Sequence, residues 1–361
     1  MSESFSLEIK SSFGNYSVRI GNDVASDYLE QQASIVLIDK NLRSYLPKLN
    51  NVTLIEIKAQ ESEKSLDTVA SVIEKLRESG ANRTTHLIAI GGGIVQDVAT
   101  MTASIYMRGI TWTYLPTTLL GMVDSCVGGK SSINVGKFKN IAGNFYPPTE
   151  VLIDTKFCQT LALAERIAGL CEAVKICYAD TGDSFEQYLK LIEKGNPVSD
   201  HGCLTEIVAL TLSTKKRFIE EDEFDNGVRL LLNFGHTFGH ALEGASNFKI
   251  THGIAVGLGM LAAYVFSIKN TPCLSANVRV QALLAHVRWL ISQVPSVRQE
   301  LLRIDIEDAV NRFKSDKKHK NNEFAIIAYD ANGYLERQLI PINDEAEARI
   351  ADSFASIGKY L

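Results

Sequence analysis

Residues 86–116 read HLIAIGGGIVQDVATMTASIYMRGITWTYLP, and this stretch decides the fold class. An apolar run at residues 86–90 is followed by three glycines, by helical periodicity at residues 94–107 and by a second apolar run at residues 111–115. Strands that are apolar throughout are typical of parallel sheets, because helices cover both faces of such sheets. The stretch therefore predicts an α/β domain.

The same pattern extends toward the N-terminus. Residues 34–39 (SIVLID) and 52–57 are short apolar runs, and residues 66–80 have helical periodicity. Residues 5–10 and 16–20 alternate between apolar and polar side chains, which predicts an opening β-hairpin.

The second half of the chain has a different texture. From about residue 162 to residue 313, apolar side chains recur at spacings of three and four, and strand-like runs disappear. A late hairpin is expected at residues 324–329 and 334–340, around Asn332 and Gly333. We therefore expect a mainly helical second domain.

Length and composition set the class of protein. At 361 residues the chain exceeds one comfortable core, so we predict an α/β domain over residues 1–155 and a helical domain over residues 156–361. A net charge of −5 argues against a nucleic-acid partner, and no apolar stretch is long enough to span a membrane. The six scattered cysteines are expected to be reduced thiols, and residues 1–16 show no basic region followed by an apolar run, so we expect a cytoplasmic protein.

Two features near the first strands are compatible with a nucleotide. The bare backbone of residues 91–93 could face an anion at a helix N-terminus, although a plain tight turn explains three glycines equally well. Asp39 follows an earlier strand, where a ribose-hydroxyl acceptor is often found; a surface aspartate is the alternative.

A glycine-rich loop gathers polar side chains. Asp124, Lys130, Lys139 and Asn140 lie within seventeen residues, beside Gly128 and Gly129. Lysines in such a loop suit a phosphate group, whereas the alternative is an ordinary solvated loop.

Histidines make the sharpest pattern. His236, His240 and His252, with Glu172 upstream, are the ligand types that Zn²⁺ or a similar ion prefers. Either member of an i, i+4 pair can instead do acid–base work or satisfy a core hydrogen bond. Arg229 and Asn233 precede His236 at spacings of four and three, so all are expected on one face of a single helix. Such a face suits a carboxylate-bearing or hydroxyl-rich substrate, and an ordinary polar helix face is the alternative.

These stretches together resemble one family. Its motifs are present in order as GGGIVQDVATMTASIYMRGITWTYLPTTLLGMVDSCVGGKSSIN, GKFKN, AGLCEAVK, DEFDNGVRLLLNFGHTFGHALE and HGIAVGLGM. They resemble the sugar-phosphate cyclases and, within them, the 3-dehydroquinate synthases, over about residues 39–318. The resemblance implies a Rossmann-like NAD-binding domain and a helical domain that holds one divalent ion, Zn or Co, with the active site in the cleft between them. A homodimer is also implied.

The resemblance implies a role for each matching residue. Matches to metal ligands are Glu172, His236 and His252, while His240 matches a residue near the substrate. Matches to substrate or catalytic positions are Asp124, Lys130, Lys139, Asn140, Lys175, Lys215, Arg229, Asn233 and Lys317, and Arg108 matches a residue that reaches the partner subunit's site. Matches to cofactor positions are Asp39, Glu61, Lys64, Gly92, Gly93, Asp97, Thr117, Thr118, Lys130, Lys139 and Thr160.

The implied activity is the closure of 3-deoxy-D-arabino-heptulosonate 7-phosphate to 3-dehydroquinate, in the shikimate route to aromatic amino acids. It proceeds by transient oxidation by NAD, phosphate elimination, reduction and intramolecular aldol closure. Alternatives are a sister cyclase of the amino-dehydroquinate or valiolone type, a metal-dependent NAD alcohol dehydrogenase, and a non-catalytic module that binds NAD and metal.

The chain departs from the family pattern at a few positions. Ile254 stands where a glutamate is expected beside His252, and Gln96 and Thr100 stand where glycines are expected. Ser131-Ser132 replaces a Thr-Gly pair, and Gln60 replaces a glycine. None of these departures removes a predicted ligand or catalytic group.

Overall fold

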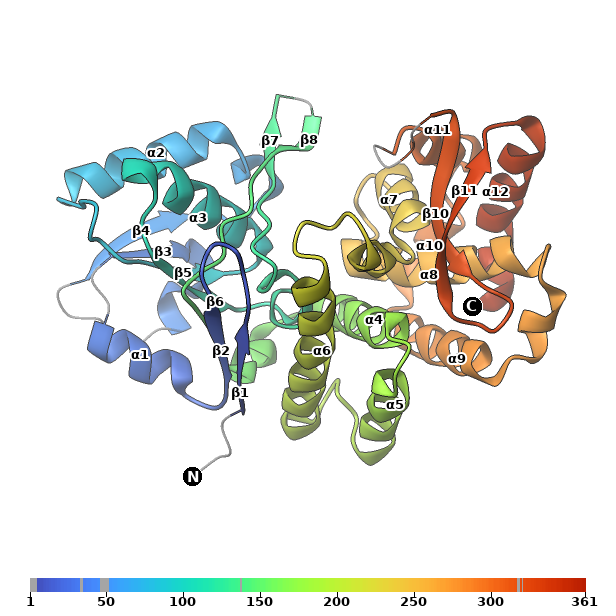
Figure 1. Cartoon of the computed structure of the whole chain (residues 1–361), viewed down its shortest axis with the longest axis horizontal. Coiled ribbons are helices and arrows are strands. Elements are labelled where there is room, and N and C mark those ends of the chain that lie inside the picture. The colour runs from blue at the N-terminus through green and yellow to red at the C-terminus, as the bar shows by residue number, and fades with distance from the viewer. Residues whose placement is uncertain (1–4, 33–34, 46–51, 137, 317–318, 320) are drawn as a thin grey trace. The chain divides into compact units, whose positions relative to one another are not determined.

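The computed structural model describes the chain apart from residues 1–4, 33–34, 46–51, 137, 317–318 and 320 (Figure 1). Contacts divide it into two compact units. The first unit contains residues 1–161 and 199–223, and the second contains residues 162–198 and 224–361. The predicted domain division at residue 155 stays a prediction. By its contacts, helix α6 (His201–Glu221) belongs to the first unit.

A seven-stranded sheet forms the centre of the first unit. Its strands are β1 (Phe5–Ile9), β2 (Tyr16–Ile20), β3 (Ile35–Asp39), β4 (Thr53–Ile57), β5 (Leu87–Gly91), β6 (Trp112–Pro116) and β9 (Glu150–Ile153). Their order is β1-β2-β9-β6-β5-β3-β4. Only β1 and β2 pair antiparallel, and every other neighbouring pair is parallel. The predicted α/β class and opening hairpin are therefore confirmed.

Helices flank this sheet, as its apolar strands require. They are α1 (Val24–Gln32), α2 (Leu66–Glu78) and α3 (Gly93–Ile105), with α2 and α3 on one side of the strands and α1 on the other (Figure 1). All five residues of β5 are buried, since α3 packs on this strand and on β3 and β6. Residues 86–116 thus form the strand, helix and parallel strand that their pattern predicts.

Short elements complete the first unit. They are η1 (Lys40–Tyr45), η2 (Glu61–Glu63), η3 (Tyr106–Arg108), the π-helical turn η4 (Gly121–Ser125), η5 (Thr155–Thr160) and a hairpin of β7 (Ile133–Val135) and β8 (Phe138–Ala142). The sequence predicted only a loop where this hairpin forms.

The second unit is mainly helical. Its helices are α4 (Leu163–Ala179), α5 (Ser184–Lys194), η6 (Val228–Asn233), α7 (His236–Ala245), α8 (His252–Ile268), η7 (Pro272–Ala276), α9 (Val278–Ser292), α10 (Ser296–Leu301), α11 (Ile306–Lys314), α12 (Asp344–Ser356) and η8 (Ile357–Tyr360). The predicted late hairpin is also present, as β10 (Glu323–Tyr329) paired with β11 (Leu335–Pro341). Gly333 in its turn has φ +84°, which favours glycine.

Helix α8 lies at the centre of the second unit. Residues 253–267 are all buried, and α4, α7, α9 and α12 pack on the helix. A Cβ atom on Gly259 would lie 1.9 Å from the carbonyl oxygen of Gly235, and one on Gly253 would lie 2.2 Å from that of Ala168. These glycines let the backbones touch.

One local prediction is wrong. Residues 229–240 were expected to form one helix, but Gly235, with φ +76°, separates η6 from α7. A left-handed residue ends the first helical turn, so Arg229 and Asn233 do not continue the helical face of His236.

Within the described part of the chain, no helix has both the length and the apolar character that a membrane crossing requires.

Candidate active site

The glycine turn lies at the carboxyl ends of the parallel strands β5 and β6. Gly92 caps α3, and a Cβ atom there would lie 2.9 Å from the Thr118 side chain. The Thr117 amide donates to the Gly91 carbonyl oxygen at 3.0 Å. Four predicted cofactor residues therefore lie together at the N-terminus of the 13-residue helix α3: Gly92, Gly93, Thr117 and Thr118. The helix dipole and the backbone N–H groups favour an anion at this place.

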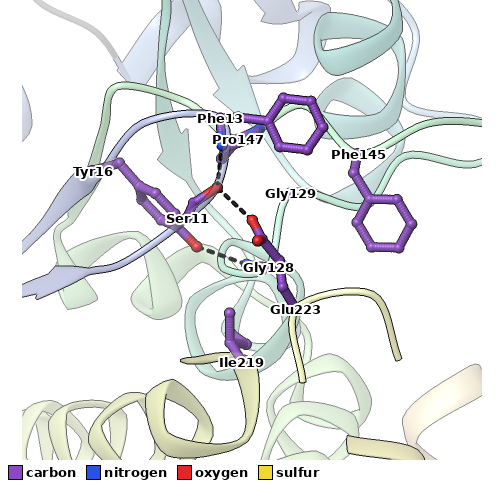
Figure 2. A pocket seen from close by; sticks show the side chains of 9 residues that line it. All are labelled: Ser11, Phe13, Tyr16, Gly128, Gly129, Phe145, Pro147, Ile219 and Glu223. Carbon is purple, nitrogen blue, oxygen red and sulfur yellow. Dashed lines mark hydrogen bonds between the residues drawn. The ribbon is translucent and has the colours of Figure 1, made fainter. Parts of the chain in front are cut away.

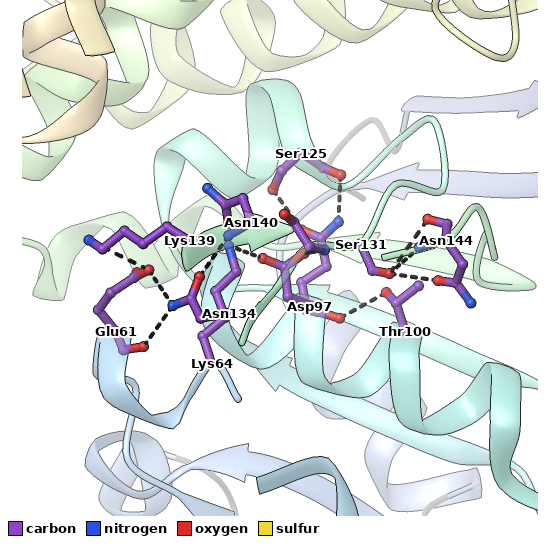
Figure 3. Close-up of polar contacts among 12 residues, drawn as sticks. Glu61, Lys64, Asp97, Thr100, Ser125, Ser131, Asn134, Lys139, Asn140 and Asn144 are labelled. Carbon is purple, nitrogen blue, oxygen red and sulfur yellow. Dashed lines mark hydrogen bonds and ion pairs between the residues drawn. The ribbon is translucent and has the colours of Figure 1, made fainter. Parts of the chain in front are cut away.

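Asp97, on the second turn of α3, joins two further segments (Figure 3). Its carboxylate lies 2.7 Å from the Lys64 ammonium group and accepts from the Ser132 amide at 2.9 Å. Burial raises the pKa of Asp97, and the charge of Lys64 opposes that rise. The structure thus brings together the predicted cofactor residues Lys64 and Asp97.

Asn134 ties the β7–β8 hairpin to η2, as Figure 3 shows. Its side-chain amide nitrogen donates to the Glu61 carboxylate at 2.8 Å, and its side-chain amide oxygen accepts from the Asn140 backbone N–H at 2.9 Å. Lys139 lies 3.8 Å from the same carboxylate. Sequence reasoning missed Asn134, although an asparagine in a glycine- and lysine-rich stretch was a signal.

Two other predicted cofactor residues stand apart. The Asp39 carboxylate accepts from the Asn41 amide at 3.0 Å, and the exposed Thr160 hydroxyl donates to the Phe157 carbonyl at 2.9 Å. Each of these two side chains thus bonds within its own segment of the chain.

Asp124 and Lys215 form a half-buried ion pair. Lys215, on α6, donates to the Asp124 carboxylate, and also to the Asp124 carbonyl oxygen at 2.5 Å and to that of Val127 at 3.5 Å. Their side chains are 19% and 7% exposed, so the pair is shielded from water but still reachable. Lys215 was recognised only through the family resemblance.

The glycine loop before Lys130 is held by its neighbours (Figure 2). The Gly128 amide donates to the Tyr16 hydroxyl at 2.8 Å, and the Tyr146 amide donates to the Gly129 carbonyl at 2.7 Å. Lys130 itself is exposed at the end of this loop. The backbone that carries the predicted phosphate-binding lysine is therefore fixed, and its side chain is accessible.

In the second unit, histidines from two helices converge on one buried carboxylate. Glu172 Oε1 lies 3.7 Å from His236 Nε2 and 3.5 Å from His252 Nε2. Glu172 is 1% exposed, and its other oxygen lies 2.5 Å from the ammonium group of Lys175. The donor atoms of His236, His240 and His252 all lie within 4.8 Å of one another.

This donor set fits a divalent metal ion. Ligands of a tetrahedral zinc ion with bonds of about 2.0–2.1 Å lie roughly 3.3 Å apart, close to the observed separations. The far nitrogens are also held: His252 Nδ1 donates to the Glu243 carboxylate at 3.0 Å, and His236 Nδ1 faces the Phe234 carbonyl oxygen at 3.3 Å. Metal-ligating histidines usually bond this way through the second ring nitrogen. Both Nε2 atoms are thereby presented toward Glu172.

His240 has different surroundings. Its Nδ1 lies 3.6 Å from the Asp316 carboxylate, and its side chain is 43% exposed. Glu243 and Asp316 were both missed from the sequence, although Glu243 lies seven residues after His236, and thus on the same helix face.

The remaining predicted residues lie as follows. Arg229 is buried in η6, and the Asn233 amide donates to the Leu230 carbonyl at 3.1 Å. Arg108 is exposed and ends η3 with φ +69°. Lys317 lies outside the described residues.

The chain matches two models of one family. Residues 54–168 match the 3-dehydroquinate synthase N-terminal model, and residues 169–319 match the C-terminal model. The chain is 36% identical over 315 residues to the 3-dehydroquinate synthase of Saccharolobus solfataricus, covering 86% of this chain and 85% of that protein. It is 34% identical over 295 residues to that of Prochlorococcus marinus, covering 81% and 79%.

Solved structures agree with this assignment. A 2-deoxy-scyllo-inosose synthase complexed with carbaglucose-6-phosphate, NAD⁺ and Co²⁺ superposes with a TM-score of 0.81 at 25% identity, covering 96% of this chain and all of that one. The parallel sheet with its glycine turn, and the separate helical unit with its histidine–glutamate cluster, define the chain as one of the sugar-phosphate cyclases, which are enzymes. Within that class, the chain belongs to the 3-dehydroquinate synthase family.

Proposed function

We propose that this enzyme converts 3-deoxy-D-arabino-heptulosonate 7-phosphate to 3-dehydroquinate and phosphate, as an NAD- and metal-dependent carbon–oxygen lyase of the shikimate pathway. The observation that carries the proposal is the convergence of His236 and His252 on the buried Glu172 carboxylate, in a chain of this family. A set of two imidazoles and one carboxylate is typical of a catalytic zinc or cobalt site.

Glu172, His236 and His252 would hold the divalent ion. Three protein ligands leave positions for substrate oxygens, and the bound ion would supply Lewis-acid polarisation of substrate hydroxyl groups. Glu243, through His252, would keep one imidazole in the ligating tautomer.

The first unit would hold the cofactor. We assign NAD to the α3 N-terminus and its surroundings, which comprise Asp39, Glu61, Lys64, Gly92, Gly93, Asp97, Thr117, Thr118, Lys130, Lys139 and Thr160. When bound, NAD⁺ would accept a hydride from a substrate carbon and return it later, so that the net conversion needs no external reductant.

The chain's own side chains bind and orient the substrate. The substrate-binding and catalytic residues we propose are Asp124, Lys130, Asn140, Lys175, Lys215, Arg229, Asn233, His240, Lys317 and Arg108. The exposed Lys130 ammonium group suits the phosphate, and the buried Arg229 guanidinium suits the carboxylate. The Asp124–Lys215 pair can hold or pass a proton, because each group keeps its partner within hydrogen-bond reach.

The proposal includes a homodimer in the cytoplasm. Exposed Arg108 is the residue that would reach the partner subunit. All six cysteines lie in the described part of the chain, where none joins another in a disulfide, which agrees with a reducing compartment.

A sister cyclase is the second candidate. Ile254 is 1% exposed in the helix that starts with His252, where the family pattern led us to expect a glutamate. A buried isoleucine beside a ligand is the one feature that favours a different sugar phosphate as substrate.

Phosphate release tests both candidates. The enzyme is assayed with catalytic NAD and Zn²⁺ or Co²⁺, with and without EDTA, on the heptulosonate phosphate and on sedoheptulose 7-phosphate. EDTA-sensitive release from the heptulosonate alone, with no net NADH, is expected. Release from sedoheptulose 7-phosphate alone would favour the sister cyclase, and net NADH formation would favour an alcohol dehydrogenase.

Metal content provides a test that is independent of turnover. His236→Ala is expected to lose the ion, whereas His86→Ala, a control histidine that bonds Thr111 and Thr113, is expected to keep it. Retained metal in His236→Ala would contradict the ligand assignment.

A further inference from the structure

Gln96 forms a reciprocal pair of hydrogen bonds with Ser125. Its side-chain amide nitrogen donates to the Ser125 backbone carbonyl oxygen at 2.6 Å, and the Ser125 hydroxyl donates to the Gln96 side-chain amide oxygen at 2.6 Å. Gln96 is only 4% exposed, so both bonds are shielded from water. They tie α3 to the π-helical turn η4, which carries Asp124.

A π-helical turn needs such support. Its wider ring, closed by the Cys126 amide on the Gly121 carbonyl oxygen at 3.1 Å, departs from the regular i→i−4 pattern. Carbonyl groups at a helix end lack intrahelical partners and are costly to bury unsatisfied. Here Lys215 donates to the carbonyl oxygen of Asp124, and Gln96 donates to that of Ser125. Two consecutive peptide groups are therefore held, and with them the direction of the Asp124 side chain.

On its other side, Gln96 belongs to the turn of α3 that begins at the glycines. Its backbone N–H donates to the Gly92 carbonyl oxygen at 3.1 Å. The next residue, Asp97, holds Lys64 and the Ser132 amide (Figure 3). Gln96 thus links the glycine turn to η4, and Asp97 links it to the segments that carry Lys64 and Ser132.

We propose that Gln96 is a positioning residue, which fixes the Asp124–Lys215 pair relative to the glycine turn through Ser125. The inference rests on the proposed function only in treating that pair as catalytic. It also explains a departure of this sequence: the family pattern led us to expect glycine at position 96, and glycine has no side chain to make these bonds.

The test compares Gln96→Leu with Thr100→Val. Leucine fills most of the volume of glutamine but makes neither bond. Thr100 is a matched control, because it is 1% exposed on the same helix and its hydroxyl donates to the Gln96 backbone carbonyl at 2.8 Å, with no bond to η4 within the described residues. We expect Gln96→Leu to lower kcat about tenfold, as losing about 1.4 kcal/mol of hydrogen bonding at the pair predicts. The KM values for substrate and NAD should stay within about twofold, and Thr100→Val should match the parent enzyme.

A double-mutant cycle with Ser125→Ala separates positioning from general destabilisation. If Gln96 acts through Ser125, the double variant should lose no more kcat than Gln96→Leu alone. Additive losses, or a kcat unchanged in folded Gln96→Leu, would overturn the proposal.

Hydrogen exchange gives a readout that needs no substrate. Backbone amides in residues 121–127 should exchange about tenfold faster in Gln96→Leu, because the closed turn would lose about 1.4 kcal/mol relative to its locally opened state. Their exchange should be unchanged in Thr100→Val. If the parent enzyme turns over no heptulosonate phosphate, the proposed function fails while exchange still tests the positioning. Unchanged exchange in an active Gln96→Leu enzyme rejects the positioning alone.

Discussion

Glu243 offers the sharpest test of the metal site, because it touches His252 and is not one of the proposed ligands. Its carboxylate accepts from His252 Nδ1 at 3.0 Å, while Nε2 of the same ring faces Glu172. Burial lowers the pKa of His252, but the hydrogen bond to Glu243 and the charge of Glu172 outweigh burial and raise it. Glu243 therefore stabilises the ring orientation and increases the basicity of the ligating nitrogen.

The expected loss follows from that contact. Outer partners of ligating histidines contribute about 10- to 100-fold in metal affinity, or about 1.4 to 2.7 kcal/mol. Glu243→Gln keeps an acceptor oxygen but loses the charge, so we expect a loss of about tenfold. Glu243→Ala loses both, so we expect a loss of about 100-fold.

The assay is the Zn²⁺ dissociation constant, measured by competition with a chelator at fixed pH. Glu300→Gln is the matched control, since Glu300 pairs with Arg303 and Lys249 in the same unit. The control should keep the parent affinity. Equal affinities for the parent enzyme and Glu243→Ala would refute the reasoning, because His252 would then need no support to bind metal.

Three further predictions follow from buried groups. Arg229→Lys should raise the KM for the heptulosonate phosphate by about tenfold or more and leave the KM for NAD unchanged, because lysine cannot make a bidentate bond to a carboxylate; an unchanged substrate KM would reject the carboxylate role. Burial lowers the pKa of His286 to about 4, so the unfolded state takes up a proton first as pH falls below 6.5, and the free energy of unfolding should drop by up to about 3 kcal/mol toward pH 4. Measured by urea unfolding, the stability of His286→Leu should fall less steeply between pH 6.5 and pH 4, and an identical fall would contradict the reasoning. Gly259→Ala should cost about 3 kcal/mol, since its Cβ would lie 1.9 Å from the Gly235 carbonyl oxygen, whereas Gly358→Ala, with no atom within 4 Å, should be neutral in thermal unfolding.

The sequence predicted the elements whose signal is local. Residues 86–116 carry a complete strand, turn, helix and strand, and the Asn332-Gly333 turn lies between two alternating runs, so both were recognisable. The ligand types were also visible, because two of the three predicted ligands are histidines only sixteen residues apart.

What the sequence did not predict depends on tertiary contacts or on single dihedral angles. The periodicity of residues 229–240 runs through Gly235, and only its φ of +76° reveals the break. A π-helical turn has the same residue types as an α-helix, so η4 gave no signal. Likewise, the pattern of α6 shows an amphipathic helix but not that it packs on η4.

The π-helical turn also makes the direction of the Asp124 side chain sensitive to the deletion of a single residue. Such turns correspond to one extra residue in an otherwise α-helical segment. Deleting one codon within positions 121–123 would let the segment close as an ordinary helix, and would rotate the Asp124 carboxylate by about 100° about the axis, since an α-helix has 3.6 residues per turn. The carboxylate would then turn away from Lys215, and the buried side chains of the same turn would shift within the core. A single in-frame deletion at this position would thus separate the Asp124–Lys215 pair, which substitutions that keep the length of the turn leave in place.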